Sequence, residues 1–112
     1  TRQRVNDTFE FTVEVTNDSG VTLSPANSAG VHALVFEDDP AGVNRVTGRY
    51  LRGDDSVSIG SLADGASDSF NLTVDLSGVG ADWNALHSVV LVDYRPGGSS
   101  GPWDMVQGAF QP

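Results

Sequence analysis

The sequence contains no cysteine, no lysine and no long hydrophobic run. Without cysteine the chain cannot form disulfides, thiolate metal sites or a cysteine nucleophile. No apolar stretch approaches the roughly 18–20 residues that a transmembrane helix needs, and no signal-peptide pattern is present. The sequence therefore predicts a chain that does not insert into a membrane.

Positively charged residues are also scarce. The chain has 15 Asp and Glu residues but only 6 basic residues, all of them arginine, which gives a formal net charge of -9. Nucleic-acid binding depends on neutralising phosphates with basic groups, so DNA and RNA are disfavoured as partners. Anionic membrane surfaces are disfavoured for the same reason. Arginine without lysine, beside many Ala, Gly, Val and Asp residues, is typical of a GC-rich bacterial genome.

The length and composition favour one folded domain. A chain of 112 residues with 38% hydrophobic content can build a single core. It begins at Thr1 and not at a methionine. We therefore expect residues 1–112 to be one domain, excised from a longer multidomain protein.

Strict alternation of apolar and polar residues predicts strands with one buried face. Thr8 to Thr16 reads T-F-E-F-T-V-E-V-T, and Phe70 to Leu76 alternates in the same way. Val31 to Phe36 and Ser88 to Tyr94 are almost continuously apolar, which indicates strands covered on both faces or twisted through the core. Trp103 to Gln111 is expected to be the last strand.

Turn residues separate these segments. Arg52-Gly53-Asp54-Asp55 is expected to break the chain between a strand at Val43 to Leu51 and a short one at Val57 to Ile59. Asp82 is a plausible N-cap for the one short helical turn expected, near residues 81–87. The fold class is therefore all-β, an antiparallel β-sandwich of about seven strands. A closed barrel is the alternative.

The order of the motifs resembles a known class of module. V-H-A-L-V-F-E-D-D, S-I-G-S-L-A-D-G, F-N-L-T-V-D-L, W-N-A-L-H-S-V-V-L-V-D-Y and W-D-M-V-Q-G-A-F follow one another from Phe9 to Phe110. This resembles the Ig-like β-sandwich modules of bacterial secreted and cell-surface proteins. The resemblance implies a secreted or cell-envelope location. It also implies a non-catalytic role as a spacer, adhesion or docking unit.

Aspartate-rich turns suggest a cation site. If the strands run alternately up and down, the loops with Asp38 and Asp39, with Asp64 and Asp68, and at residues 95–102 share one end of the domain. Carboxylates from neighbouring loops would suit calcium, although no Asp-x-Asp-x-Asp-Gly loop is present. The alternative is that the aspartates only build solvated turns, which their side chains favour. Calcium is the one cofactor that the sequence suggests.

Aromatic residues around the last loop suggest a binding surface. Tyr94, Arg95 and Trp103 flank the glycine- and proline-rich segment 95–102, and loops on a rigid sandwich often carry recognition. Exposed rings would also suit a polysaccharide, with Trp83 and Tyr50 as further candidates. Trp83 is expected to plug the end of the core, and Trp103 to be the more exposed ring.

The remaining motifs are weak. His87 and Ser88 could be imagined in a Ser-His-Asp arrangement, but no nucleophile-elbow motif supports it, and we expect no enzymatic activity. Arg52-Gly53-Asp54 spells an integrin-binding tripeptide that is also ordinary turn chemistry. N-glycosylation patterns occur at Asn6, Asn17 and Asn71 and are expected to be silent.

The leading hypothesis is therefore an accessory domain that binds a protein partner or a neighbouring domain of the same chain. An edge strand or the loop at residues 95–102 would carry the contact. The alternatives are a carbohydrate-binding module and a calcium-stabilised adhesion module.

Overall fold

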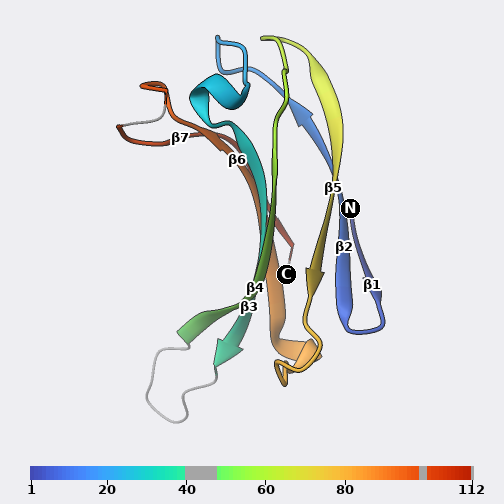
Figure 1. Cartoon of the computed structure of the whole chain (residues 1–112). Coiled ribbons are helices and arrows are strands. Elements are labelled where there is room, and N and C mark those ends of the chain that lie inside the picture. The colour runs from blue at the N-terminus through green and yellow to red at the C-terminus, as the bar shows by residue number, and fades with distance from the viewer. Residues whose placement is uncertain (40–47, 99–100, 112) are drawn as a thin grey trace.

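The protein is a sandwich of two antiparallel β-sheets (Figure 1). The computed structural model describes residues 1–39, 48–98 and 101–111. One sheet has the strand order β1-β2-β5 and the other β4-β3-β6-β7. The strands are β1 (Arg2–Val5), β2 (Thr8–Thr16), β3 (Gly30–Asp39), β4 (Gly48–Ser58), β5 (Ser67–Asp75), β6 (Leu86–Tyr94) and β7 (Asp104–Gln111). The predicted antiparallel sandwich of about seven strands is confirmed.

Two single turns of 3-10 helix accompany the strands. η2 (Trp83–Ala85) lies in the predicted region, and the Asp82 side chain caps it by accepting a hydrogen bond from the backbone N–H of Asn84 at 3.1 Å. η1 (Pro25–Asn27) was not predicted. It follows Ser24, whose side chain accepts from the N–H of Ala26. Within the described ranges, no helix is long and apolar enough to cross a membrane.

The core lies between the two sheets, and alternation of side chains supplies it. In β2, Phe9, Phe11 and Val15 are buried, as the sequence pattern predicts. The exposed positions that alternate with them are Glu10, Thr12, Glu14 and Thr16. The same holds for Leu72 and Val74 in β5. The opposite sheet contributes the buried residues Val31, Ala33, Val35, Leu86, Val90 and Val92.

The predicted break at residues 52–55 is wrong. β4 continues through all four residues, and Ala33, Leu34 and Val35 of β3 pair with Asp55, Asp54 and Gly53. The irregularity is a register shift opposite Val35 and Phe36, where Arg52 is the extra residue of a bulge. In the loop before β3, Leu23 makes an isolated bridge with Leu62. The predicted segment 43–47 lies outside the described residues.

The continuity of β4 decides which loops share an end of the sandwich. One strand runs where two were expected, so every later loop moves to the opposite end. The loops before β3, between β4 and β5, and between β6 and β7 meet at the end that carries η1 (Figure 1). The loop between β5 and β6 lies at the other end, where η2 also lies.

Candidate functional site

The outward side of the four-stranded sheet carries apolar residues in place of polar ones. β3 and β6 bury Val35 and Val90 on the inner side, but Leu34 and Val89 point outward and are only half-buried. The outward apolar residues form one surface across four strands, here called the apolar face. It consists of Leu34, Phe36, Leu51, Val89, Leu91 and Met105.

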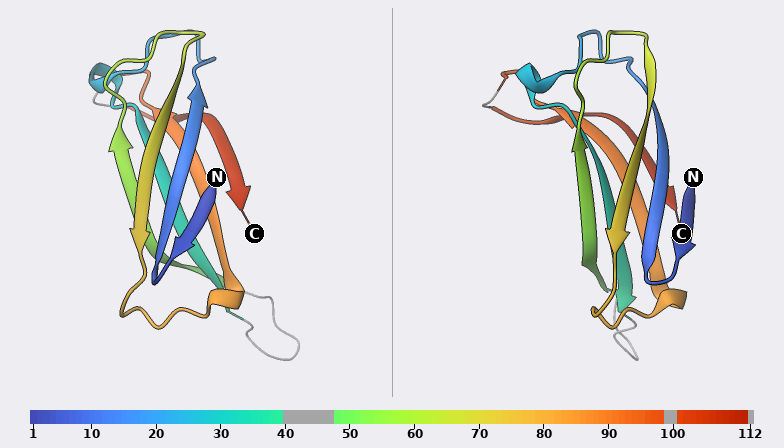
Figure 2. Two further views of the ribbon diagram at one scale, coloured as in Figure 1. Left: turned by 90° about the vertical axis from the view of Figure 1, so that its right-hand side faces the viewer. Right: turned by 45° about the vertical axis from the view of Figure 1, so that its right-hand side comes forward.

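Solvent reaches this face directly. Leu51 is 52% exposed and Met105 65% exposed. The described part of the chain forms two layers, so no third layer covers the four-stranded sheet from outside (Figure 2). Val31–Phe36 was predicted to be covered on both faces or twisted through the core, and the described residues cover only its inner face. Contiguous exposed apolar surface of this kind marks interaction sites.

Two histidine–aspartate pairs border the apolar face. His32 Nε2 shares a hydrogen bond with Asp93 Oδ1 at 2.9 Å, and His87 Nε2 shares one with Asp38 Oδ2 at 2.5 Å. Both pairs join β3 to β6, one towards each end of the sheet. Asp54 points outward opposite Leu34 and is exposed. The rim of the apolar face is thus acidic, with carboxylates at Asp38, Asp54 and Asp93.

The structure separates the serine and histidine that could have suggested catalysis. Ser88 is fully buried on the inner side of β6, where its hydroxyl accepts a hydrogen bond from Arg2 at 2.9 Å. His87 is its neighbour in sequence and therefore points to the opposite side of the sheet. These two side chains do not form a nucleophile–base pair.

The predicted calcium group is not assembled. Asp38 lies at the end of the sandwich opposite to Asp64 and Asp68, because β4 is one continuous strand. Asp64 Oδ1 accepts a hydrogen bond from the N–H of Gly20 at 3.0 Å, and Asp68 Oδ1 accepts one from the N–H of Ser69 at 2.8 Å. These two carboxylates therefore bind backbone groups of a turn and of a strand end. The side chain of Asp39 lies outside the described residues. Of the side chains described, no three from His, Asp and Glu gather where they could hold a metal ion.

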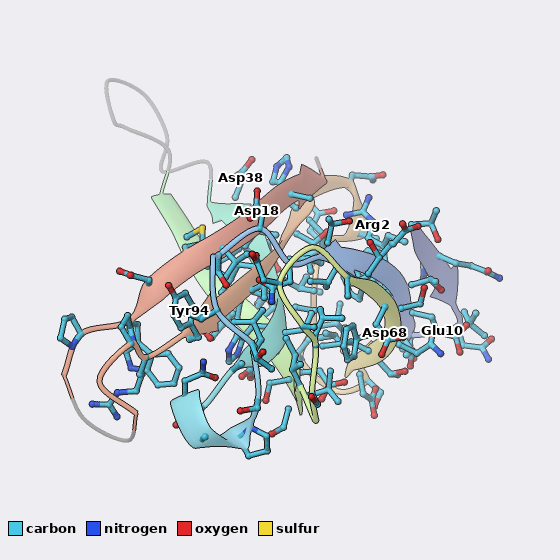
Figure 3. All side chains as sticks on the ribbon, turned by 90° about the horizontal axis from the view of Figure 1, so that it is seen from above. Arg2, Glu10, Asp18, Asp38, Asp68 and Tyr94 are labelled. Carbon is cyan, nitrogen blue, oxygen red and sulfur yellow. The ribbon has the colours of Figure 1, made fainter. Side chains whose placement is uncertain are left out.

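Figure 3 looks down the long axis of the sandwich and shows how the labelled residues divide between the sheets. Asp68 lies with Glu10 on the three-stranded sheet, and Tyr94 lies on the four-stranded sheet. Asp38 belongs to β3 of the same four-stranded sheet as Tyr94, so the acidic candidates Asp38 and Asp68 lie on different sheets.

The predicted aromatic loop has one exposed ring. Trp103 is 49% exposed, and the guanidinium of Arg95 lies 5.2 Å from its ring centroid. Arg95 also donates to the carbonyl oxygen of Gly101 through Nε at 3.1 Å and Nη2 at 2.8 Å. Tyr94 packs against the core, so the two rings do not form a shared platform. Residues 99 and 100 of this loop, and the Tyr50 side chain, lie outside the described residues.

Trp83 plugs the core, as predicted. Its ring meets Phe9 edge-on at a centroid distance of 5.1 Å, and the guanidinium of Arg4 lies 3.6 Å from its centroid.

Arg4 belongs to β1, a strand that was not predicted. The signal for β1 was the turn at Asn6-Asp7, where Asn6 adopts a φ of 54°, directly before the clear strand β2. Asn and Asp in that position are typical of a hairpin.

The Arg-Gly-Asp tripeptide lies inside β4 and not in a loop. Arg52 Nε donates to Glu37 Oε2 at 2.6 Å, and both side chains are largely buried. Gly53 faces the other sheet, where an added Cβ would lie 2.8 Å from Val74 Cγ1. The tripeptide is therefore part of the sandwich framework.

The sequence was also compared with known proteins. No protein-family model and no curated protein matches it.

Proposed function

We propose that this protein is a non-catalytic docking module whose apolar face binds another protein domain. The observation that carries the proposal is that β3 and β6 have apolar side chains on both sides, while the described residues cover only the inner side. A sheet with one side in water normally carries polar residues there. Leaving Leu34, Phe36, Val89 and Leu91 in contact with water is unfavourable unless a partner covers them.

The acidic rim specifies the chemistry of the partner. Asp38, Asp54 and Asp93 surround the apolar face, and the whole chain has a net charge of -9. Two copies would bring their acidic rims together, which repels. The partner is therefore a domain with an apolar centre and a Lys- or Arg-rich border. Such pairing speeds association and disfavours wrong partners.

The setting of this module follows from the sequence resemblance. We infer an accessory domain of a larger secreted or cell-envelope bacterial protein, with the partner on a neighbouring domain or a separate protein. The sequence motifs and the acidic, lysine-free composition support this setting.

Site-specific photo-crosslinking tests the docking function. A benzophenone amino acid is placed at Leu34 or Leu91 of the parent protein in its native cells, with matched controls at Glu10 and Thr73 on the outward side of the other sheet. We expect discrete cross-links from the first two positions only. The cross-linked domain, purified, should bind the wild-type module, and binding should fall in L34E and L91E variants. Cross-links equal from both sheets, or none from Leu34 and Leu91, would contradict the proposal.

Sugar binding at Trp103 is a second candidate, favoured by the 49% exposure of that ring. Aromatic faces stack on the apolar faces of sugars. Titration of a polysaccharide panel should then quench or blue-shift tryptophan emission in the wild-type protein and in a W83F variant. The response should disappear in W103F. Absence of any response across the panel would reject this candidate.

A further inference from the structure

β3 and β6 carry the same short pattern on the outward side of the four-stranded sheet. The pattern is His, two apolar residues and Asp at alternate positions, and it reads H-A-L-V-F-E-D from His32 to Asp38 and H-S-V-V-L-V-D from His87 to Asp93. In both segments the residues of the pattern are half-buried, and the residues between them are buried on the inner side. Two neighbouring strands therefore present the same order of side chains on one surface.

The antiparallel register of β3 and β6 relates the two copies of the pattern by an approximate two-fold axis through the sheet. The histidine of each copy pairs with the second apolar residue of the other copy, and the first apolar residues pair with each other at the centre. Each histidine therefore lies beside the aspartate that ends the opposite copy. This is why the apolar face has a histidine–aspartate hydrogen bond at both ends. The outward pairs are His32–Leu91, Leu34–Val89 and Phe36–His87.

The charged groups around the two histidines are mostly aspartates. Besides the aspartate that each histidine contacts, Asp54 of β4 is exposed on the same side of the sheet. Arg49 of β4 pairs with Asp38 in the register, and its side chain lies outside the described residues. On β7 the residue opposite β6 is the uncharged Met105. The Asp82 carboxylate, which caps η2, is bonded to the backbone of its own turn.

Protonation of the two histidines changes the charge around the apolar face. Histidine is the side chain whose charge ordinarily changes between about pH 5 and pH 8. While both imidazoles are neutral, Asp38 and Asp93 each contribute a negative charge, and once the imidazoles are protonated each hydrogen-bonded pair has no net charge. A partner with a Lys- or Arg-rich border is attracted by the first state and loses this attraction in the second. Because two ligands affect each other reciprocally, such a partner also opposes protonation.

We propose that acidification weakens docking at the apolar face, because protonation of His32 and His87 cancels the negative charge of the two histidine–aspartate pairs. This inference rests on the docking function proposed above and adds its regulation. The apolar centre does not titrate, so its contribution to binding is the same at every pH. The two-fold arrangement places one titrating pair at each end, and both ends of the face therefore respond together. The partner is held near neutral pH and released as the imidazoles gain their protons.

Two small amphiphiles test this regulation. Decyltrimethylammonium combines an apolar chain with a permanent positive charge, and decyl maltoside has the same chain without charge, so neither probe titrates. Each is added below its critical micelle concentration at about pH 7.5 and at about pH 5.5, which span the ordinary titration of histidine. NMR shifts of the methyl groups of Leu34, Val89 and Leu91 report binding. The cationic probe should bind about threefold more weakly at the lower pH, the effect of one charge at about 6 Å in water. The neutral probe should bind equally at both.

The H32Q/H87Q variant separates the two pairs from other effects of pH. Glutamine can donate a hydrogen bond to each aspartate but gains no charge in this range, and the amide spectrum reports whether the fold is kept. The cationic probe should bind this variant equally at both pH values, and either single variant, H32Q or H87Q, should show a smaller pH dependence than the wild type. Equal binding of the cationic probe to the wild type at both pH values, or an unchanged dependence in the variants, would overturn the regulation and leave the docking function standing. Absence of methyl shifts with both probes would overturn the docking function and this inference together.

Discussion

The carboxylate of Asp55 on β4 accepts a hydrogen bond from the backbone N–H of Thr73 on β5, with 2.9 Å between the two atoms. The bond connects the two sheets along one long side of the sandwich. Asp54, the neighbour of Asp55, points outward beside the apolar face and is exposed. Adjacent aspartates in one strand therefore have different structural roles, which makes them a matched pair for mutation.

Replacing Asp55 by alanine should lower the free energy of unfolding by about 1 kcal/mol, the usual net contribution of one intramolecular hydrogen bond. D54A removes the same charge from the same strand and should change stability by less than about 0.5 kcal/mol. Urea unfolding followed by tryptophan emission measures both. If the two variants lose equal stability, charge and not the Asp55–Thr73 bond is responsible.

Replacing Gly53 by alanine should also destabilise the sandwich. The new Cβ would lie 2.8 Å from Val74 Cγ1 and 3.1 Å from Leu76 Cδ2, and overpacking of this kind costs about 1–3 kcal/mol. Gly60 is the control, because a Cβ there would meet no atom within 4 Å. G60A should be neutral or slightly stabilising. Thermal unfolding of both variants tests the close contact between β4 and β5.

The regular strands could be predicted because one side of each faces water. β2 and β5 alternate strictly, since Phe9 and Leu72 enter the core while Glu10 and Thr73 remain outside, and sequence patterning detects that period. β1 escaped prediction because Arg2 and Arg4 are on its inward side. Their guanidinium groups lie over Phe9 and Trp83, a contact that only the folded structure creates.

The candidate sites were harder to predict, because they depend on pairings far apart in sequence. Arg52-Gly53-Asp54-Asp55 has the composition of a turn, yet the Glu37–Arg52 ion pair and the Asp55–Thr73 bond hold it within the sandwich. Because this segment was predicted to be a turn, Asp64 and Asp68 were expected at the same end of the sandwich as Asp38. They lie at the opposite end, because β4 is continuous. The apolar composition of β3 and β6 was visible in the sequence. Their uncovered outward side was not, because a near-continuous apolar run is typical of strands covered on both faces.

Asn17 should be one of the most sensitive polar positions. It is fully buried, and its Nδ2 donates to the carbonyl oxygens of Val21 at 2.7 Å and Leu62 at 2.8 Å. N17A would leave these acceptors without their donor, which should cost about 1–3 kcal/mol. N71A, at another glycosylation pattern but on an exposed strand position, should cost less than about 0.5 kcal/mol. Chemical unfolding compares the two.

The same burial predicts how the glycosylation patterns behave. Expressed through a glycosylating host, the folded protein should carry no glycan at Asn17, because its amide nitrogen is enclosed and already donates two hydrogen bonds. Mass spectrometry of tryptic peptides checks this. A glycan on Asn17 of correctly folded protein would contradict the described environment.

Asp75 should make stability depend on acidity. Its pKa lies below the ordinary value of 3.8, chiefly because the backbone N–H of Ser77 donates to its carboxylate at 2.9 Å. A folded-state pKa below the unfolded one gives stabilisation that is present above pH 3.8 and is lost as the pH falls through the folded value. D75N should therefore melt below the wild type near neutrality and approach it in acid.

Melting curves from about pH 2 to about pH 6 measure that difference, since the range spans the ordinary titration of carboxylates. S77A is the control: it removes the hydroxyl of Ser77 but keeps the backbone N–H, the larger cause of the lowered pKa. It should retain most of the pH dependence. A gap between D75N and the wild type that does not change with pH would contradict the role of this bond.

The link between β4 and β5 has a consequence for motion. Asp55 and Gly53 hold β4 against β5 along one long side of the sandwich. Local fluctuations that separate the two sheets should therefore leave this side closed, so that it acts as the hinge. Amide hydrogen exchange would then be slow at Thr73, whose N–H is bonded to Asp55, and along β3 and β6.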